Sequence, residues 1–492
     1  MSNENSTGVT RLASFKNYFP PATAVVLVLL IYVGFVSGGH WTRWPKTSDY
    51  YDQLATSFQH GQLALLTKPD PALLALQNPY NPEQRTNIPF VMDASLYKGR
   101  YYLYFGPMPP LILAIIKFLV PLEISDQYLV FFFITGIFIL QSFLLVKIRR
   151  RFFDNLPDWM DAIAILAAGL IGPFTRMLVH PWIYEAALSG GQFFFLAGLT
   201  SAFLAFERAK VNNRWLLAAG ILWACAVGTR ITQLFAIAFM GLAILVFVLR
   251  NALQTKSYST AVRSIGMLAV PLAGAGIALA WYNYARFGSI FEFGLYYQLA
   301  YNLQSFYHTM FLRGYIPQNL YNYFLNPFSL SGSFPFLIPQ NGNKTPLFSF
   351  YSLPRPYVID GVITGLINAS PFIIFAVVPV FHLVVSWVSK NEIKSSDENF
   401  LQWMNASLIG SFLASFIPLM MFFYAATRYE ADFMPSLSML AVIGFWEICA
   451  SAKNKKRLQS LWFFAGAWLA IISVIINTVI AFASHLTWFG IF

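Results

Sequence analysis

Residues 49–61 read DYYDQLATSFQHG and open a polar segment, rich in Tyr and Pro, that runs to residue 110. The apolar side chains recur at the spacing i, i+3, i+4, i+7 of one helix face, at Tyr51, Leu54, Ala55 and Phe58. Gly61 is a natural C-terminal stop. We therefore expect a short amphipathic helix that lies on a membrane surface with its apolar face down.

The composition around this segment is that of a membrane protein. The chain has 492 residues, of which 57% are hydrophobic, 18% aromatic and 11% charged, whereas soluble domains are about 25% charged. Apolar runs of roughly 20 residues, long enough to cross a bilayer, recur along the chain. The expected fold class is an all-α polytopic membrane protein, one domain over residues 1–492, with about 11 transmembrane helices (10 to 13 as the range).

The net charge of +11 does not indicate a nucleic-acid partner. Lys and Arg fall in short gaps between apolar runs, which is the positive-inside pattern of cytoplasmic loops. Cys225 and Cys449 lie in apolar segments far apart in sequence, so they predict neither a disulfide framework nor a metal-ligand set. The first apolar run, 22–37, has no convincing cleavage site and is interpreted as a retained span.

The basic gaps predict a topology. If they are cytoplasmic, at 11–16, 147–151, 208–214, 250–263, 390–394 and 453–457, the C-terminus is external. The spans then fall near 22–39, 128–146, 160–178, 188–206, 215–229, 231–249, 265–283, 369–388, 402–424, 433–449 and 460–482. The segments predicted to be external are 40–127, 176–187, 229–230, 286–360 and 427–432.

Two external loops are long, 40–127 and 286–360. Within the first, residues 109–121 form a short apolar run that contains Lys117 and is bounded by prolines, so we expect a helix on or dipping into the outer leaflet. In the second loop, 291–311 predicts one or two interfacial helices, and the Pro-rich remainder predicts a loop.

The first loop also carries the candidate acidic groups. Asp49 fits a helix N-cap and Asp52 position N3, but either carboxylate could instead be a general base whose pKa is raised beside a lipid headgroup. Asp93 is a further candidate. Lys98 and Arg100 flank Gly99 in a predicted turn between two extended pieces, and cations at this place suit a phosphate.

Four short motifs resemble those of one family. The helix after the first span and the segment 99–111 (GRYYLYFGPMPPL) are similar to the first external loop of GT-C glycosyltransferases, in the branch of protein O-mannosyltransferases and lipid A aminoarabinose transferases. Residues 228–230 (GTR), 282–289 (YNYARFGS) and 428–435 (RYEADFMP) extend the resemblance over nearly the full chain.

The resemblance implies transfer of a sugar from a polyprenyl-phosphate carrier to an acceptor on the non-cytoplasmic face. Family members carry an Asp-Glu pair where this chain has Thr47 and Ser48, and often an Asp in the next external turn, where HPWIYE (180–185) ends in Glu185. The base is therefore predicted as Asp49, with Asp93 and Asp52 behind it, and Glu185 is the other acidic candidate.

The phosphate is predicted to contact Arg230 and Arg428, with Lys98 or Arg100 beside them. Each arginine also has a simpler role, Arg230 as a salt bridge or headgroup contact and Arg428 in an i, i+4 pair with Asp432. The remaining substrate-binding candidates are His180, which could instead pair with Glu185, together with Arg286, Tyr429 and Asp432.

The sequence thus predicts an inverting glycosyltransferase of the bacterial inner membrane with its active face towards the periplasm. Its partners would be a polyprenyl-phosphate sugar, membrane lipids and an envelope glycan, lipid or protein acceptor, with no nucleic acid. No cofactor or metal cluster is identified, although a carboxylate-bound divalent cation stays open. The alternatives are a transporter or lipid flippase, which predicts internal repeats and midplane charges, and a non-catalytic assembly or lipid-binding relative.

Overall fold

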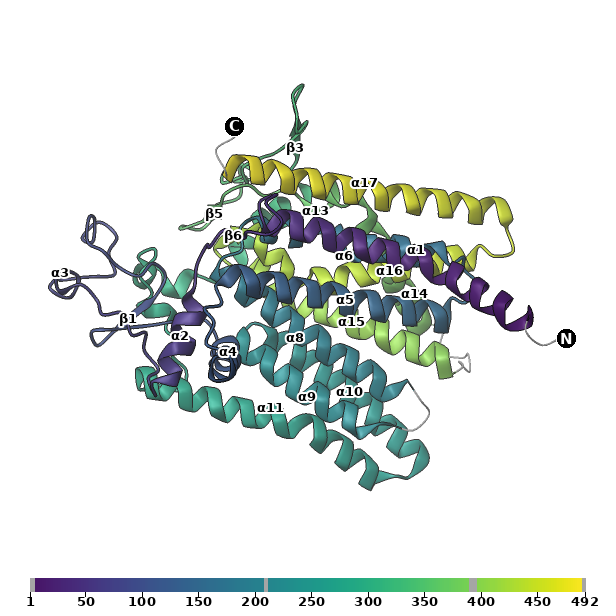
Figure 1. Ribbon diagram of the computed structural model, residues 1–492, viewed down its shortest axis with the longest axis horizontal. Helices are drawn as coiled ribbons and strands as arrows, with labels where there is room; N and C mark the ends of the chain where they lie inside the picture. The colour runs from purple at the N-terminus through teal and green to yellow at the C-terminus, as the bar shows by residue number, and fades with distance from the viewer. Residues whose placement is uncertain (1–4, 208–210, 389–395, 489–492) are drawn as a thin grey trace.

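The computed structural model describes residues 5–207, 211–388 and 396–488, with side chains described over 21–207, 211–388 and 397–486, and it consists mainly of long helices that run side by side (Figure 1). The predicted basic residues Arg208, Lys210, Lys390 and Lys394, with the side chains of Arg11 and Lys16, lie outside the described part. The long helices are α1 (Asn5–Val36), α5 (Asp126–Phe152), α8 (Ile183–Phe206), α9 (Asn213–Thr229), α10 (Gln233–Thr255), α11 (Tyr258–Phe287), α14 (Val377–Val388), α15 (Ser396–Met420), α16 (Met434–Ser451) and α17 (Lys456–Trp488).

Eight helical segments in the described ranges are long and apolar enough to cross a membrane: Asp126–Phe152, Ile183–Phe206, Gln233–Thr255, Tyr258–Phe287, Pro371–Val388, Asp397–Met420, Met434–Ser451 and Lys456–Leu486. The predicted all-α polytopic membrane fold is confirmed. α8 and α16 are central, because 89% and 83% of their apolar windows are buried, against 11% for α11 at the edge. Small residues such as Gly190 and Gly198 let neighbouring helices approach α8 closely.

The prediction of one continuous span over 160–178 is wrong, because the structure has two shorter helices there. α6 (Trp159–Leu170) ends and α7 (Phe174–Val179) begins after a turn at Gly172, where φ is +105° and Pro173 follows. Glycine adopts this backbone conformation at little cost, whereas a side chain would strain it. The break brings the Arg176 side chain to the end of the bundle.

The segments predicted to be external gather at one end of the bundle, called the loop end here (Figure 1). The ends of α5, α8 and α15 meet at the opposite end, where Lys147 pairs with Glu207 (2.5 Å) and Arg151 with Asp397 (2.7 Å). The basic gaps and the long loops are therefore separated by the length of the helices, as the predicted topology requires.

The first loop contains both predicted short helices, but the apolar face of α2 (Tyr50–Gln59) is buried in the protein core and is not exposed for contact with a membrane. α2 buries Tyr51, Leu54 and Ala55. α4 (Met108–Leu119) is seen end-on in Figure 1, so its axis is roughly perpendicular to the bundle helices, which lie in the plane of the picture. Lys117 of α4 donates to the Asp52 carboxylate of α2 (2.7 Å). Between them lie α3 (Pro71–Leu74) and an antiparallel hairpin of β1 (Ser95–Tyr97) and β2 (Arg100–Tyr102).

The turn expected at Lys98-Gly99 is confirmed. Both residues have positive φ, +47° and +71°, as a two-residue hairpin turn of type I′ requires.

The second long loop has more order than the sequence predicts, but not the expected interfacial helices over 291–311. It forms short helical turns there, η1 (Leu295–Tyr297), η2 (Leu303–Ser305) and η3 (Tyr307–Thr309). After these come η4 (Arg313–Tyr315), α12 (Ile316–Leu320), η5 (Tyr321–Leu325), β3 (Phe328–Leu330), β4 (Leu337–Pro339), β5 (Val358–Asp360), α13 (Leu366–Ala369) and η6 (Pro371–Ala376).

β5 pairs in parallel with β6 (Tyr424–Ala426), which leads into η7 (Thr427–Asp432) before α16. This pairing attaches the end of the long loop to the start of a central helix. It aligns Asp360 with Ala426, two residues before Arg428.

Gly106 fixes the first loop against the end of α9. A Cβ atom at this position would meet the backbone carbonyl oxygens of Gly228 and Thr229, which cannot move like a flexible side chain. The contact holds the loop beside Arg230.

We predict that Gly106→Ala lowers the apparent melting temperature of the purified protein, since forced overpacking costs about 1–3 kcal/mol. The matched control is Gly266→Ala in α11, where a Cβ has nothing within 4 Å and alanine is the better helix former. Equal melting curves for the two variants would show that the Gly106 contact relaxes without cost.

Candidate functional site

A cavity of about 1610 Å³ opens among the helix ends at the loop end of the bundle. Its wall combines apolar side chains with an unusual concentration of ionisable groups, which come from the first loop, the ends of α7 to α11, the long loop and η7. The charged or titratable lining residues include Asp93, Arg176, His180, Glu185, Arg230, Arg286, Glu292, Asp360, Arg428 and Asp432.

Arg428 stands at the centre of this group. Its Nη1 donates to the Asp360 carboxylate, and the β5–β6 pairing sets this contact because it places the two chain segments in register. Its guanidinium lies over three tyrosine rings, with Cζ 4.8 Å from the ring centroid of Tyr184, 5.5 Å from Tyr429 and 5.9 Å from Tyr424. The predicted i, i+4 pair with Asp432 is wrong, because η7 is a six-residue 3₁₀ helix and not an α-helix, so residues four apart do not lie on one face.

Asp432 instead pairs with Arg230, which lies in the turn between α9 and α10. Nε of Arg230 is 3.0 Å from Oδ1 and Nη2 is 2.7 Å from Oδ2, a bidentate arrangement. Gln233 also donates to Oδ1 (3.2 Å). The Arg230 guanidinium lies 5.8 Å from the ring centroid of Tyr429, so that one tyrosine contacts both arginines.

Asp93 is held differently. It has φ of +60°, a strained conformation for a residue with a side chain, and such strain is common at functional sites. Its side chain is mostly buried and accepts a hydrogen bond from Nε2 of Gln298 (2.9 Å). Burial raises the pKa of Asp93 to about 6, although Arg428 and the Gln298 amide oppose the shift.

Glu185, His180 and Arg176 line the same cavity. The Glu185 carboxylate accepts from the backbone N–H of Trp182 (3.2 Å) at the start of α8. Arg176 donates to Thr427 Oγ1 (2.9 Å) and to the carbonyl of Val362 (3.1 Å). Burial, reinforced by Arg176, lowers the pKa of His180 to about 4, so this imidazole is neutral at pH 7.

Arg286 lies at the end of α11. It donates to the carbonyl of Leu103 (2.6 Å) and to Asn283 Oδ1 (2.8 Å), with its Cζ 3.8 Å from the ring centroid of Tyr282. These contacts attach the first loop to α11, which makes Arg286 a structural cation as well as part of the cavity wall.

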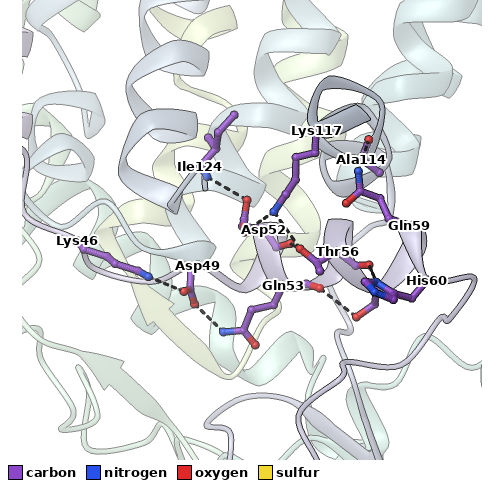
Figure 2. Close-up of polar contacts among 11 residues, drawn as sticks. Lys46, Asp49, Asp52, Gln53, Thr56, Gln59, His60, Ala114, Lys117 and Ile124 are labelled. Carbon is purple, nitrogen blue, oxygen red and sulfur yellow. Dashed lines mark hydrogen bonds and ion pairs between the residues drawn. The ribbon is translucent and has the colours of Figure 1, made fainter. Parts of the chain in front are cut away.

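Four predicted site residues do not line this cavity. Asp49 pairs with Lys46 (2.8 Å) and accepts from Gln53 (2.6 Å), and it sits at the N-cap of α2 without a capping hydrogen bond (Figure 2). Asp52 is bound by Lys117 and by the backbone N–H of Ile124 (3.0 Å). Lys98 and Arg100 lie at the exposed turn of the β1–β2 hairpin.

The positions of the family's acidic pair have a structural role in this chain. Thr47 Oγ1 donates to the carbonyl of Pro181 (2.6 Å). Ser48 Oγ donates to the buried Asp126 carboxylate and accepts from the backbone N–H of Ile183 (3.0 Å). The two hydroxyls therefore join the first loop to the starts of α5 and α8.

Asp360, Arg176 and Gln298 are cavity residues that sequence reasoning missed. None of them lies in a recognisable motif, and Asp360 and Gln298 belong to a loop whose path depends on distant pairings. The one available signal was Asp360 itself, the last acidic residue before the hydrophobic segment that follows the long loop.

We predict that Asp432→Asn lowers the free energy of unfolding by about 2 kcal/mol, because it leaves the mostly buried Arg230 without a counter-charge. Breaking a fully buried pair would cost roughly 3–5 kcal/mol. The cost is smaller for this pair because the Arg230 side chain is 21% exposed. The matched control is Asp397→Asn, which breaks the pair of Asp397 with Arg151. The Asp397 carboxylate is 59% exposed, so this pair contributes little to the free energy of unfolding. Thermal unfolding of both variants in detergent measures the difference. A similar loss in both would place the Asp432 pair among ordinary surface pairs.

No known family model and no curated protein matches the chain. Three solved chains of the oligosaccharyltransferase of Archaeoglobus fulgidus are similar to it in structure. The apo form has a TM-score of 0.48 at 14% identity, the form tethered to an acceptor peptide with an NVT sequon 0.48 at 13%, and the complex of this enzyme, AglB, with an inhibitory peptide and dolichol-phosphate 0.47 at 13%. The matches cover 95% or 96% of this chain but only 56% of those chains.

Proposed function

We propose that this chain is a membrane glycosyltransferase of the GT-C type, which transfers a sugar from a polyprenyl-phosphate carrier to an acceptor. The observation that carries the proposal is the cavity at the loop end, in which several buried carboxylates, Asp93 among them, and several arginines share one space. Fixed cations suit a phosphate leaving group, and a carboxylate of raised pKa suits a general base.

Arg428 and Arg230 are the proposed phosphate ligands. The Nε–H of Arg428 is buried and has no acceptor among the described residues, so a phosphate oxygen could accept from this donor. Both guanidiniums hold carboxylates in the structure, Asp360 and Asp432, so an incoming phosphate would share or replace these contacts. Tyr429 lies against both and keeps them on one wall.

The carrier chain would extend over the apolar part of the same cavity. Leu234 and Phe235 of α10 and Leu279 of α11 line it near Arg230, and the first two are about half exposed. A prenyl tail placed there would leave its phosphate at the helix ends. This arrangement supports a lipid-linked donor over a nucleotide sugar, whose base would find few polar groups along these helices.

Asp93 is the proposed base in place of Asp49. The acceptor oxygen would attack the sugar carbon on the face opposite the phosphate, as the bond from carbon to phosphate oxygen breaks and the phosphate leaves with the electron pair. Asp93 would take the acceptor proton, and the anomeric configuration would invert. Glu185 and His180 would contact the sugar or the acceptor.

The proposed location is the bacterial inner membrane with the cavity facing the periplasm. It rests on the basic groups at the opposite end, which the positive-inside rule assigns to the cytoplasm. The acceptor would be an envelope lipid, glycan or protein. No group of three His, Cys, Asp or Glu side chains in the described ranges is placed to hold a metal ion, and no step above requires one.

We predict that Asp93→Asn reduces sugar transfer by about 10²–10⁴-fold, the usual contribution of a general base, whereas Asp49→Asn retains most activity. The assay would use protein in nanodiscs, a radiolabelled lipid-linked sugar fraction from cells that lack this protein, and a matching envelope fraction as acceptor. Melting curves control for folding. Full transfer by Asp93→Asn would exclude the proposed base, and loss only in Asp49→Asn would restore the order that the sequence predicts.

We also predict that the transfer rate rises as the pH increases through about 6, because Asp93 acts as a base only when it is deprotonated and its pKa is raised to about 6 by burial. Gln298→Leu removes an N–H that stabilises the carboxylate, so the acidic limb should move to higher pH. A role of Gln298 in folding alone would lower the rate at every pH without moving this limb.

The raised pKa of Asp93 also predicts that folding stability falls as the pH rises, whereas the transfer rate increases. Since the folded-state pKa of Asp93 is raised above the ordinary value, stability is lost as the pH rises from about 4 to about 6. Asp93→Asn should remove this part of the pH dependence, which thermal unfolding across that window would detect.

A further inference from the structure

The β3–β4 hairpin is an exposed apolar feature that the proposed function does not use. β3 pairs with β4 in antiparallel register, with Ser329 opposite Ile338 and Leu330 opposite Leu337. Four of its large apolar residues are strongly exposed, namely Leu330 (80%), Phe336 (54%), Phe334 (52%) and Ile338 (45%). Apolar side chains gathered in this way usually mark a contact surface.

The surrounding sequence has no charge. No Asp, Glu, Lys, Arg or His lies between Arg313 and Lys344, although this stretch belongs to a loop outside the predicted spans. A loop in contact with water alone is normally rich in charged and polar residues. The absence of charge removes the main cost of moving a segment towards a bilayer.

The hairpin is also at the correct place for a membrane contact. The Phe334 ring meets Phe482 near the loop end of α17, with 5.4 Å between centroids, and Phe482 belongs to a segment apolar enough to span a membrane. Figure 1 draws β3 beyond α17, projecting sideways from the bundle at the loop end. This direction is parallel to the membrane plane if the helices cross the bilayer.

The backbone limits how deep the hairpin lies. The sheet has two strands in the described chain, so each strand keeps one edge whose N–H and C=O groups have no strand partner. Such groups are too costly in the hydrocarbon core, but water reaches them in the headgroup layer. Aromatic side chains are enriched at this same depth.

We propose that the β3–β4 hairpin is a membrane arm, which lies in the headgroup layer of the leaflet at the loop end and directs Leu330 and Phe336 towards the acyl chains. The occupant of this apolar surface is therefore lipid. The inference stands on the membrane fold and does not require the proposed glycosyltransferase activity.

The arm also has a second face. Ser331, Ser333, Phe334 and Ile338 line the cavity, whereas Leu330 and Phe336 do not. One hairpin thus separates the cavity from the surrounding leaflet. Its position in the headgroup layer would hold this wall of the cavity at the depth where the polar part of a lipid lies.

Spin labelling tests the arm directly. Cys225 and Cys449 are the chain's only cysteines, so Cys225→Ala and Cys449→Ala provide a background in which Leu330→Cys carries a single nitroxide. The matched control is Leu74→Cys on α3, another exposed leucine (48%) at the loop end but far from the bundle (Figure 1). The protein is reconstituted in phosphatidylcholine nanodiscs with one copy per disc, and collision with oxygen and with a water-soluble nickel chelate is measured for each label.

We expect the label at position 330 to be several-fold less accessible to nickel and more accessible to oxygen than the label at position 74. The result should be the same with phosphatidylglycerol added and at high salt, because the arm carries no charge. Equal nickel accessibility at both positions would overturn the proposal. Protection only in anionic discs, or only when two copies share a disc and their labels broaden each other's spectra, would also overturn it.

Discussion

The cost of placing arginine side chains at the end of a membrane bundle constrains the rest of this site. A guanidinium there keeps its charge, so it needs a counter-charge, a set of acceptors or an aromatic face nearby. Arg230 has Asp432, Arg428 has Asp360 and three tyrosine rings, and Arg286 has carbonyl and amide oxygens with the Tyr282 ring. Asp432, Asp360 and the Leu103 carbonyl come from parts of the chain distant from the arginines that they bind. The cations therefore organise the loops at the same time as they make the cavity suited to an anion.

The same cations attach the loops that form the cavity wall. The Arg428–Asp360 contact continues the β5–β6 pairing, which attaches the second long loop to the turn before α16. The Arg286 contact with Leu103 attaches the first loop to α11. Under the proposed function, a phosphate that drew Arg428 away from Asp360 would weaken one of these attachments, so donor binding would affect the position of the long loop.

In the first loop, a hydroxyl pair lies where members of the resembled family carry an acidic pair. Thr47 and Ser48 connect the loop to the starts of α5 and α8, with Asp126 buried beneath Ser48. Neutral groups can remain buried at such a junction at low cost because their hydrogen bonds are satisfied. Asp93, held at positive φ beside Gln298, lines the cavity instead, and burial raises its pKa to about 6, which suits the proposed role as a base.

Local sequence determined much of the architecture. Apolar length and basic gaps predicted the helices and which segments share an end, periodicity predicted α2, and Lys98-Gly99 predicted the hairpin turn, because these features depend on neighbouring residues alone. Tertiary structure decided the partners. The i, i+4 spacing suggested that Arg428 binds Asp432, but the η7 turn and the β5–β6 pairing direct these residues to Asp360 and Arg230 instead. Likewise the sequence favoured Asp49 over Asp93 as the base, yet of these two residues only Asp93 lines the cavity. Charge pairing across distant segments depends on the path of the loops, and that path follows from contacts no local pattern encodes.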